Sequence, residues 1–398
     1  MYDSLIYGRE PSPGLPPNEP VRSYAPGSPE RSAIDAELKA MAANPVEIPL
    51  VIGGKEVRTG RIKEIRSPHD RSLVLGRYHE AGEAEAIAAA DAAAVASREW
   101  SETPFQERAA VFRKAADLIS SGWWKTLNAS TMLGQSKNAY QAEIDSTCET
   151  ADFFRINPAL AERLYAEQPR SGAGERNLTD YRPLDGFVYA VTPFNFTAIA
   201  ANLPSAPALM GNTVVWKPAS SSVLSNWHLM RLYKAAGLPD GVINFLPGSA
   251  RAISAGALSR PDLAGLHFTG STAVFNSLWK GIADNLSAYA SYPRLVGETG
   301  GVSFGQRGIL RDDVTQFLAG SKCLCLPVAR VKEQDGPIPF PSRAVGQLVQ
   351  CRLQLRRCRI QEGRHRHAHP LQGLSHLIGI LYRSTEVGPV IIVSYPDD

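Results

Sequence analysis

Residues 186–301 constrain the fold of this chain more than any other stretch of its sequence. Short apolar runs of strand-forming residues alternate there with segments of helical pattern, and each run is closely followed by Pro, Gly, Asn, Ser or Thr. Such alternation is typical of parallel βαβ units. It predicts an α/β fold with a mostly parallel, doubly wound sheet, whose strands fall at Phe187–Val191, Val214–Trp216, Val242–Phe245, Gly265–Phe268 and Leu295–Val296.

The polar residues that follow these strands mark the expected functional edge of the sheet. Open α/β sheets bind their ligands at the carboxyl ends of their parallel strands. The segments TPFNF (192–196), KP (217–218) and TGST (269–272) each come directly after a predicted strand. We therefore expect binding and catalytic residues within these segments.

Composition narrows the class of protein. The 398 residues suffice for two or three domains with a large core. A net charge of +3 gives no global bias toward nucleic acid. No apolar run reaches the roughly 18 residues of a membrane span, and the first residues lack the hydrophobic core of a signal peptide. We expect an intracellular protein without a membrane or nucleic-acid partner, whose five cysteines do not suggest a disulfide framework.

The part of the chain before residue 186 predicts an arm, a small set of strands and several helices. Residues 8–31 are rich in Pro, Gly and Ser and are expected to run extended over the surface. Ser32 is a candidate N-cap for the first helix. The expected elements are helices at Ser32–Ala43, 82–100, Pro104–Asn128 and Ala139–Leu164, a hairpin at Ile48–Val57 that turns at Gly53-Gly54, and edge strands at Ile62–Ile65 and Leu73–Tyr78.

The pattern degrades after Gly301. Residues 326–345 are Pro-rich, and residues 350–369 are basic without a persistent period. His365, His367 and His369 alternate there, and Cys351 and Cys358 lie upstream, but this spacing matches no standard zinc pattern. Six arginines in 352–366 lack the interleaved aromatic residues of a nucleic-acid site. We predict an unstructured basic stretch with no metal, and a shifted reading frame or misplaced splice junction over 302–385 is a hypothesis for its origin.

Several long motifs carry a resemblance to a known family. They are NEPVRSYAPGSPER (18–31), TMLGQSKNAYQAEID (131–145), DYRPLDGFVYAVTPFNFTAIAANLPSAPALMGNTVVWKP (180–218), HFTGST (267–272) and YPRLVGETGG (292–301). In type and order they resemble the aldehyde dehydrogenases, more closely the Δ1-pyrroline-5-carboxylate dehydrogenase branch (L-glutamate γ-semialdehyde dehydrogenase). The resemblance covers roughly residues 17–301 and resumes near TEVGP (385–389).

The resemblance implies an activity and a domain plan. It implies NAD-dependent oxidation of L-glutamate γ-semialdehyde to L-glutamate, in the bacterial cytoplasm or the mitochondrial matrix. The plan is an extended arm (1–31), a Rossmann-like NAD-binding domain with N-terminal helices (32–300) and an incomplete, aberrant catalytic domain (301–398). The family also suggests a homo-oligomer, but we expect the dimerising C-terminal strand and the loop that anchors the substrate carboxylate to be absent.

Catalysis by this family requires a thiolate, an oxyanion donor, a hydride acceptor and a base. The resemblance assigns the base to Glu298, just after a predicted strand and between glycines, and the oxyanion donor to Asn195. Cys323 is the candidate nucleophile, because Gly320-Ser321-Lys322-Cys323 partly matches the family motif. Its distance from Glu298, 323 − 298 = 25 residues, is shorter than the family interval. The alternatives are a solvated glutamate, an asparagine that satisfies loop backbone groups and an incidental cysteine.

The resemblance also assigns the cofactor site. Lys217 would contact the ribose hydroxyls, and Ser271 would cap a helix beneath the pyrophosphate. Ser220 stands where related enzymes often carry an acid. The alternatives are an exposed lysine and an ordinary capped turn. The full set assigned to NAD is Thr192, Pro193, Phe194, Lys217, Gly248, Phe268, Thr269, Gly270, Ser271 and Glu386.

A second reading of the sequence is not an enzyme. A truncated, catalytically defective family member would keep much of the NAD-binding domain and at most bind NAD. NADH production from the semialdehyde separates the two readings.

Overall fold

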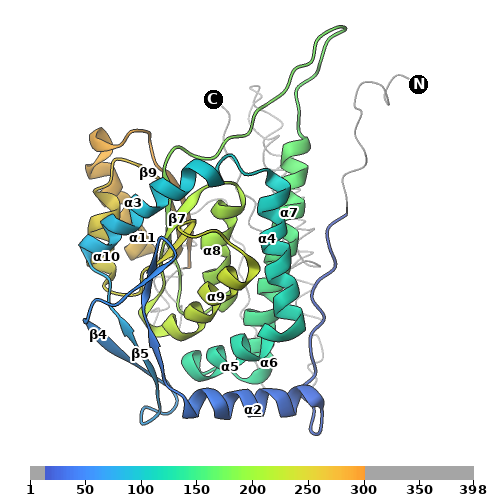
Figure 1. Cartoon of the computed structure of the whole chain (residues 1–398), viewed down its shortest axis with the longest axis vertical. Helices are drawn as coiled ribbons and strands as arrows, with labels where there is room; N and C mark the ends of the chain where they lie inside the picture. The colour runs from blue at the N-terminus through green and yellow to red at the C-terminus, as the bar shows by residue number, and fades with distance from the viewer. Residues whose placement is uncertain (1–13, 301–398) are drawn as a thin grey trace, which may run out of the picture. The chain divides into compact units, whose positions relative to one another are not determined.

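The computed structural model describes residues 14–300 of the chain (Figure 1). Its main sheet has seven strands in the order β10-β9-β6-β7-β8-β2-β3. The five strands from β10 to β8 in that order run parallel, and the hairpin of β2 and β3 adds an antiparallel margin. The strands are β2 (Leu50–Ile52), β3 (Lys55–Val57), β6 (Phe187–Val191), β7 (Thr213–Lys217), β8 (Ile243–Phe245), β9 (Leu263–Gly270) and β10 (Arg294–Thr299). The predicted mostly parallel sheet is confirmed.

Helices connect and cover these strands. They are α2 (Pro29–Ala43), α3 (Glu83–Trp100), α4 (Phe105–Leu118), α5 (Trp124–Gln135), α6 (Ala139–Ala142), α7 (Glu149–Ala166), α8 (Thr197–Leu209), α9 (Val223–Ala236), α10 (Ala250–Leu258) and α11 (Thr272–Asp284). Two π-helical turns, η1 (Ile119–Trp123) and η2 (Glu143–Cys148), and two 3-10 turns, η3 (Ser220–Ser222) and η4 (Leu286–Ala288), complete them. Among residues 14–300, no helix combines the length and apolarity that crossing a membrane would need.

Both faces of the sheet are buried, which makes the fold doubly wound. Side chains alternate between the faces along a strand. In β6, Val188 and Ala190 pack into a core formed with α4, α5, α7, α8 and α9. Phe187 and Tyr189 pack into a second core formed with α3, α10 and α11. Burial on both sides explains why the predicted strands read as continuous apolar runs instead of alternating ones.

A second, three-stranded sheet has the order β1-β5-β4. It contains β1 (Val46–Ile48), β4 (Ile62–Arg66) and β5 (Val74–His79), close to the two predicted edge strands. The predicted hairpin at Ile48–Val57 begins later, at Leu50, because the preceding residues pair with β5 instead.

Three helix predictions need correction. The first helix begins at Pro29, and its N-cap is Ser28, whose Oγ accepts a hydrogen bond of 3.1 Å from the Arg31 amide. Ser32 lies inside the helix, and its hydroxyl donates to the Ser28 carbonyl. The helices predicted at Pro104–Asn128 and Ala139–Leu164 are each interrupted by a π-helical turn, η1 after Leu118 and η2 after Ala142. Periodicity alone does not reveal such a turn, because one extra residue per turn leaves most of the apolar stripe intact.

The predicted domain boundaries at residues 31 and 300 stay predictions. Residues 301–398 lie outside the described part of the chain, and with them the predictions made for that segment.

Candidate active site

The ends of the parallel strands bring the predicted residues to one edge of the main sheet. Val191 of β6 pairs with Lys217 on one side and with Phe268 on the other. Farther along the edge, Thr269 pairs with Glu298. Neighbouring strands lie about 4.8 Å apart, so the row from β10 to β7 spans roughly 14 Å. The structure thus gathers the three predicted segments and Glu298 along one edge.

Glu298 lies within strand β10, and the prediction that it follows the strand is wrong. It is exposed, and its Oε2 accepts a hydrogen bond of 3.2 Å from the Thr269 hydroxyl. Gly297 does not form a turn there. A Cβ at Gly297 would lie 2.4 Å from the Phe275 ring of α11, so this position needs glycine for close packing. The carboxylate is therefore presented from an extended strand.

Asn195 lies in the loop between β6 and α8 with its side chain exposed. Within residues 14–300 its amide group makes no hydrogen bond, since the loop is held by other residues. The alternative that Asn195 satisfies loop backbone groups is therefore not what the structure shows. Its amide N–H groups are free to bind a ligand oxygen.

Lys217 is buried at the end of β7, with 7% of its surface exposed, so the alternative of an exposed lysine is wrong. Burial lowers the pKa of its ammonium from 10.5 to about 8. Within the described residues the ammonium has no hydrogen-bond or ion-pair partner. A buried unpaired cation is costly, and a ligand that supplies hydrogen-bond acceptors would relieve that cost.

The turn between β9 and α11 has the predicted cap. Ser271 is the N-cap residue of α11, and its Oγ accepts a hydrogen bond of 3.3 Å from the Val274 amide. The N-terminus of this 13-residue helix faces the same edge as the strand ends. Gly270 packs over the Phe268 ring, 2.7 Å from where a Cβ would stand. This geometry suits the binding of a phosphate group.

Contacts inside the protein account for three other residues singled out in the sequence. Gly248 has a φ of +150° and pairs with Ala81, whose backbone atoms would lie 2.6 Å from a Cβ at that position. The Thr192 hydroxyl accepts a hydrogen bond of 3.0 Å from Trp216 Nε1. Burial raises the pKa of Tyr78, and the neighbouring Ser220 side chain opposes that rise. The predicted cofactor contacts of Gly248 and Thr192 stay predictions.

The structure adds an acidic residue that the sequence reasoning missed. Glu149 begins α7, and burial, followed by the charge of Asp145, raises its pKa from 4.5 to about 7. The charge of Glu298 also contributes to raising the pKa of Glu149, so the two carboxyl groups lie within electrostatic range of each other. Asp145 and Glu149 are four residues apart on a helical segment, and this spacing was the available signal for a shared face.

Residues 14–300 contain no cysteine whose thiol would be nucleophilic at neutral pH. Cys148 is buried, and burial together with the Glu143 charge raises the pKa of its thiol to about 12. At neutral pH it carries no thiolate, which is the nucleophilic form. Cys323 and Glu386 lie outside the described residues, as does the His and Cys cluster of 351–369. Over the part that is described, no three His, Cys, Asp or Glu side chains are grouped to hold a metal ion.

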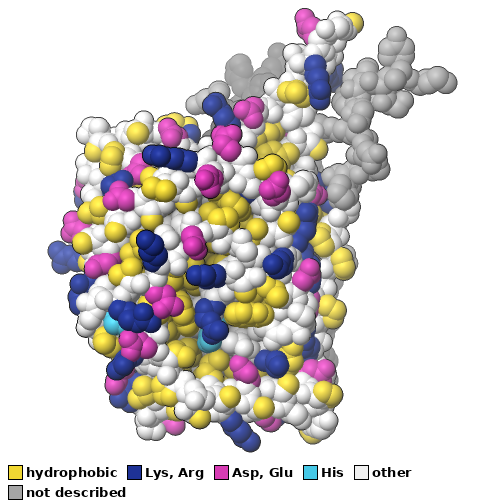
Figure 2. Space-filling model, in the orientation of Figure 1, with side chains coloured by type: hydrophobic (Ala, Val, Ile, Leu, Met, Phe, Trp, Pro, Cys, Tyr) yellow, Lys and Arg dark blue, Asp and Glu magenta, His cyan; other side chains and the backbone are white. Residues whose placement is uncertain are grey.

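The face of the molecule in Figure 2 carries basic and acidic side chains interspersed, with apolar side chains between them. This face offers no run of basic side chains of the kind that tracks a nucleic-acid backbone.

Comparisons of the sequence with a family model and with curated proteins agree on one family. A model described as the aldehyde dehydrogenase family matches residues 56–305. The Delta-1-pyrroline-5-carboxylate dehydrogenase of Agaricus bisporus is 51% identical over 292 residues, which are 72% of this chain and 53% of that protein. The mitochondrial Delta-1-pyrroline-5-carboxylate dehydrogenase of Emericella nidulans is 50% identical over 291 residues, covering 72% of this chain and 51% of that one. The chain spans about half the length of the curated relatives it matches.

Solved structures agree with these sequence matches. The Delta-pyrroline-5-carboxylate dehydrogenase from Mycobacterium tuberculosis bound with NAD superposes with a TM-score of 0.71 at 52% identity, covering 73% of this chain and 55% of that chain. A 1-pyrroline-5-carboxylate dehydrogenase from Thermus with bound NAD superposes with a TM-score of 0.67 at 29% identity, covering 73% and 56%. The predicted fold class is confirmed.

Proposed function

The chain belongs to the aldehyde dehydrogenase family, and on this premise we propose that it oxidises L-glutamate γ-semialdehyde to L-glutamate with NAD+, a step of proline degradation. The semialdehyde is the open form of Δ1-pyrroline-5-carboxylate, the compound in the names of relatives that are between 42% and 51% identical. The observation that supports the proposal most is the Lys217 side chain, which is buried at the carboxyl edge and whose ammonium is unpaired within the described residues.

NAD+ fits the residues at this edge. The Lys217 ammonium would donate to the ribose hydroxyls, and the N-terminus of α11 at Ser271 would face the pyrophosphate. Phe194, with 63% of its surface exposed, and Pro193 lie in the neighbouring loop. When bound there, NAD+ supplies the hydride acceptor of the reaction.

The chain supplies the other groups. Cys323 is the proposed nucleophile, and its thiolate would add to the aldehyde carbon while the Asn195 amide donates to the oxyanion. After oxidation to the thioester, Glu298 would take a proton from the water that attacks it. That attack releases the carboxylate product and regenerates the thiolate. An exposed carboxylate held by a single hydroxyl donor, as in Glu298, is free to approach water.

The proposed partners follow from the same premise. The ligand is a small aldehyde, and the family favours a homo-oligomer. Relatives from Emericella nidulans and Dictyostelium discoideum are described as mitochondrial. We propose the mitochondrial matrix or the cytoplasm as the compartment.

The second candidate function is NAD binding without turnover. It is favoured by one observation, namely that the match to the family ends at residue 305 whereas Cys323 comes later in the sequence. In this case the edge residues would keep their affinity for the cofactor.

Two measurements on the purified full chain test both proposals. The first is NADH formation from NAD+ and L-glutamate γ-semialdehyde, and the second is titration with NADH by fluorescence. We expect turnover that Glu298→Gln lowers by roughly 10²-fold or more while NADH affinity stays within about twofold. The control Glu175→Gln, on an exposed loop, should leave both unchanged. NADH binding without turnover would support the second candidate, and absence of both would refute the two together.

A further inference from the structure

We infer that Lys137 and Asp145 are positioning residues for Asn195: their ion pair holds the loop between β6 and α8 in the conformation that presents the Asn195 amide. The inference rests on the proposed function, in which Asn195 donates to the oxyanion. Neither residue was assigned a role from the sequence.

The loop is short and is fixed at both ends. At its first end the Thr192 amide donates to the Lys217 carbonyl at 3.2 Å, and the Thr192 hydroxyl accepts from Trp216. At its second end the Thr197 hydroxyl lies 2.8 Å from both Thr131 Oγ1 and Gln135 Nε2. Only residues 193–196 lie between these anchors, so whatever restrains the second half of the loop restrains Asn195.

Asp145 restrains the backbone of that second half. Phe196, the N-cap residue of α8, has no side-chain capping hydrogen bond. The buried carboxylate of Asp145, a residue of η2, supplies this cap instead, since its Oδ1 accepts a hydrogen bond of 3.3 Å from the Ala198 amide. A negative charge at a helix N-terminus is favourable, so the carboxylate fixes where α8 begins.

Lys137 restrains the side chain next to Asn195. Its ammonium forms an ion pair with Asp145 Oδ2 and lies 4.3 Å from the centroid of the Phe196 ring. One pair of side chains therefore holds both the backbone after Asn195 and the ring adjacent to it. Buried ion pairs contribute little net stability, because desolvation offsets their attraction. A positional role explains why the pair is kept there.

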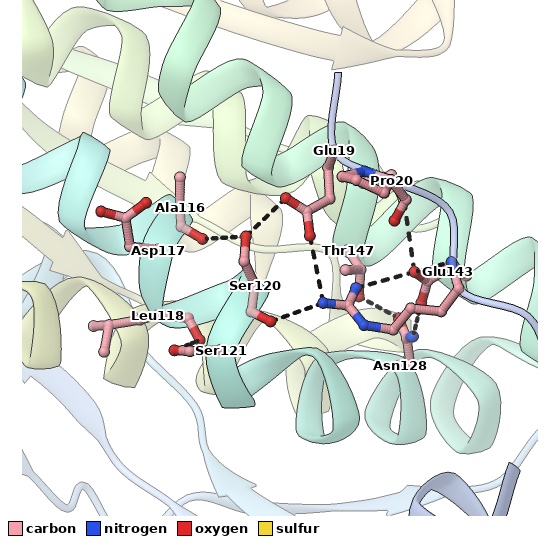
Figure 3. A network of polar contacts seen from close by, with 12 residues as sticks. Glu19, Pro20, Ala116, Asp117, Leu118, Ser120, Ser121, Asn128, Glu143 and Thr147 are labelled. Atoms are coloured by element: carbon pink, nitrogen blue, oxygen red, sulfur yellow. Dashed lines mark hydrogen bonds and ion pairs between the residues drawn. The ribbon is translucent and has the colours of Figure 1, made fainter. Parts of the chain in front are cut away.

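The pair is itself held in place by the N-terminal arm, residues 14–28. Glu143 lies two residues before Asp145 in η2, and it accepts hydrogen bonds from Arg22 and Tyr24. It also accepts one from Asn128 (Figure 3). These contacts fix η2 in space, and η2 carries Asp145. These contacts connect the arm through η2 to the loop between β6 and α8, and they hold the Lys137–Asp145 ion pair in a fixed position.

The test compares three variants with the wild-type chain. In Lys137→Met/Asp145→Ala no charge is left buried alone, and in Lys137→Met the carboxyl group of Asp145 can take up a proton. Lys137→Arg keeps the ion pair and is the conservative control. We expect kcat to fall roughly 10- to 100-fold in the first two, the KM and the NADH dissociation constant to stay within about threefold, and Lys137→Arg to keep most of the activity. Hydrogen exchange of the amides in 194–198 should accelerate roughly tenfold in the first two variants, because the Ala198 amide loses its acceptor or the ion pair that holds this acceptor in place.

Repeating the substitutions on an Asn195→Ala background separates positioning from general damage. If the pair acts through Asn195, the double substitution lowers kcat no further once Asn195 is gone. An equal further loss on that background, or unchanged amide exchange in 194–198, would overturn the inference. A wild-type chain without turnover contradicts the proposed function instead, and the exchange rates alone then decide on the pair.

Discussion

Two regions of the molecule treat their polar groups in opposite ways. At the carboxyl edge of the sheet, Lys217 and Asn195 have no side-chain hydrogen-bond partner among the described residues. Where the N-terminal arm meets the π-helical turns, Glu143 accepts hydrogen bonds from three side chains and Glu19 accepts from Arg155 and Ser120. Figure 3 shows the Ser120–Glu19 and Asn128–Glu143 contacts of this network. A protein leaves polar groups unpaired where a ligand will complete them, and pairs them where they hold the chain together. Substitutions in the two regions should therefore affect different quantities.

The largest effect on stability is expected from Glu143→Ala. This fully buried carboxylate is replaced by a methyl group, which leaves the Arg22 guanidinium partly buried and without one of its acceptors. We expect a loss of about 3–5 kcal/mol in the free energy of unfolding, measured by urea denaturation, with NADH affinity changed less than about twofold. The matched control is Lys280→Ala, which breaks an exposed ion pair with Asp284 and should cost less than about 0.5 kcal/mol. Equal losses in the two variants would contradict the contrast between the regions.

Lys217→Met should have the opposite effect to Glu143→Ala. We expect it to raise the stability of the folded protein and to lower its affinity for NADH. The folded-state pKa of about 8 lies below the unfolded value of 10.5, so the buried charge costs stability below about pH 8, and the cost disappears as the pH rises toward 10.5. We expect the variant to be about 2 kcal/mol more stable at about pH 7, with a smaller gain at about pH 9.5. Its NADH dissociation constant should rise at least about tenfold. Lys39→Met, at an exposed site on α2, is the control and should change neither quantity. A destabilised Lys217→Met with unchanged affinity would show that the ammonium is a structural group.

The sheet and its edge were predictable because their signals are local in sequence. Strands such as Phe187–Val191 are buried on both faces and end at turn-forming residues, so the apolar run and its punctuation appear together. Ser271 is a further case, since a cap and its helix are adjacent in the chain. The sequence pattern predicted that this strand ends at Val296, which is too early. Pairing with the long strand β9 extends β10 through Glu298.

The contacts of the arm and the π-helical turns were not predictable in this way, although the extended course of the arm was. Arg22 and Glu143 are 121 residues apart, and no sequence pattern near either residue indicates that the two form a pair. Glu149 shows the same limit in its electrostatics, since burial raises its pKa first of all, and the charge of Glu298, from a strand far along the chain, adds to the rise. Local pattern thus identifies the candidate edge of the sheet, whereas the contacts around its residues come from tertiary packing.

Glu149 lies between the two regions and gives the smallest and most specific prediction. Its carboxyl group is partly buried among Asp145, Asp152, Lys137 and Glu298. The folded-state pKa of about 7 is above the unfolded value of 4.5, so the folded protein loses stability as the pH rises from about 4.5 to 7 and this group becomes charged.

Glu149→Gln removes that charge and should therefore be more stable relative to wild type at about pH 8 than at about pH 4. We expect this difference to be on the order of 1–2 kcal/mol, because partial exposure of the group weakens the full effect of the shift. Urea denaturation at the two pH values measures it, and Glu175→Gln on the exposed loop serves as the control that should show no such difference. If the Gln variant gained nothing at about pH 8, the Glu149 carboxylate would have to be paired there like the groups beneath the arm. Glu149 would then belong with the paired polar groups beneath the arm, and the unpaired groups would begin at β10.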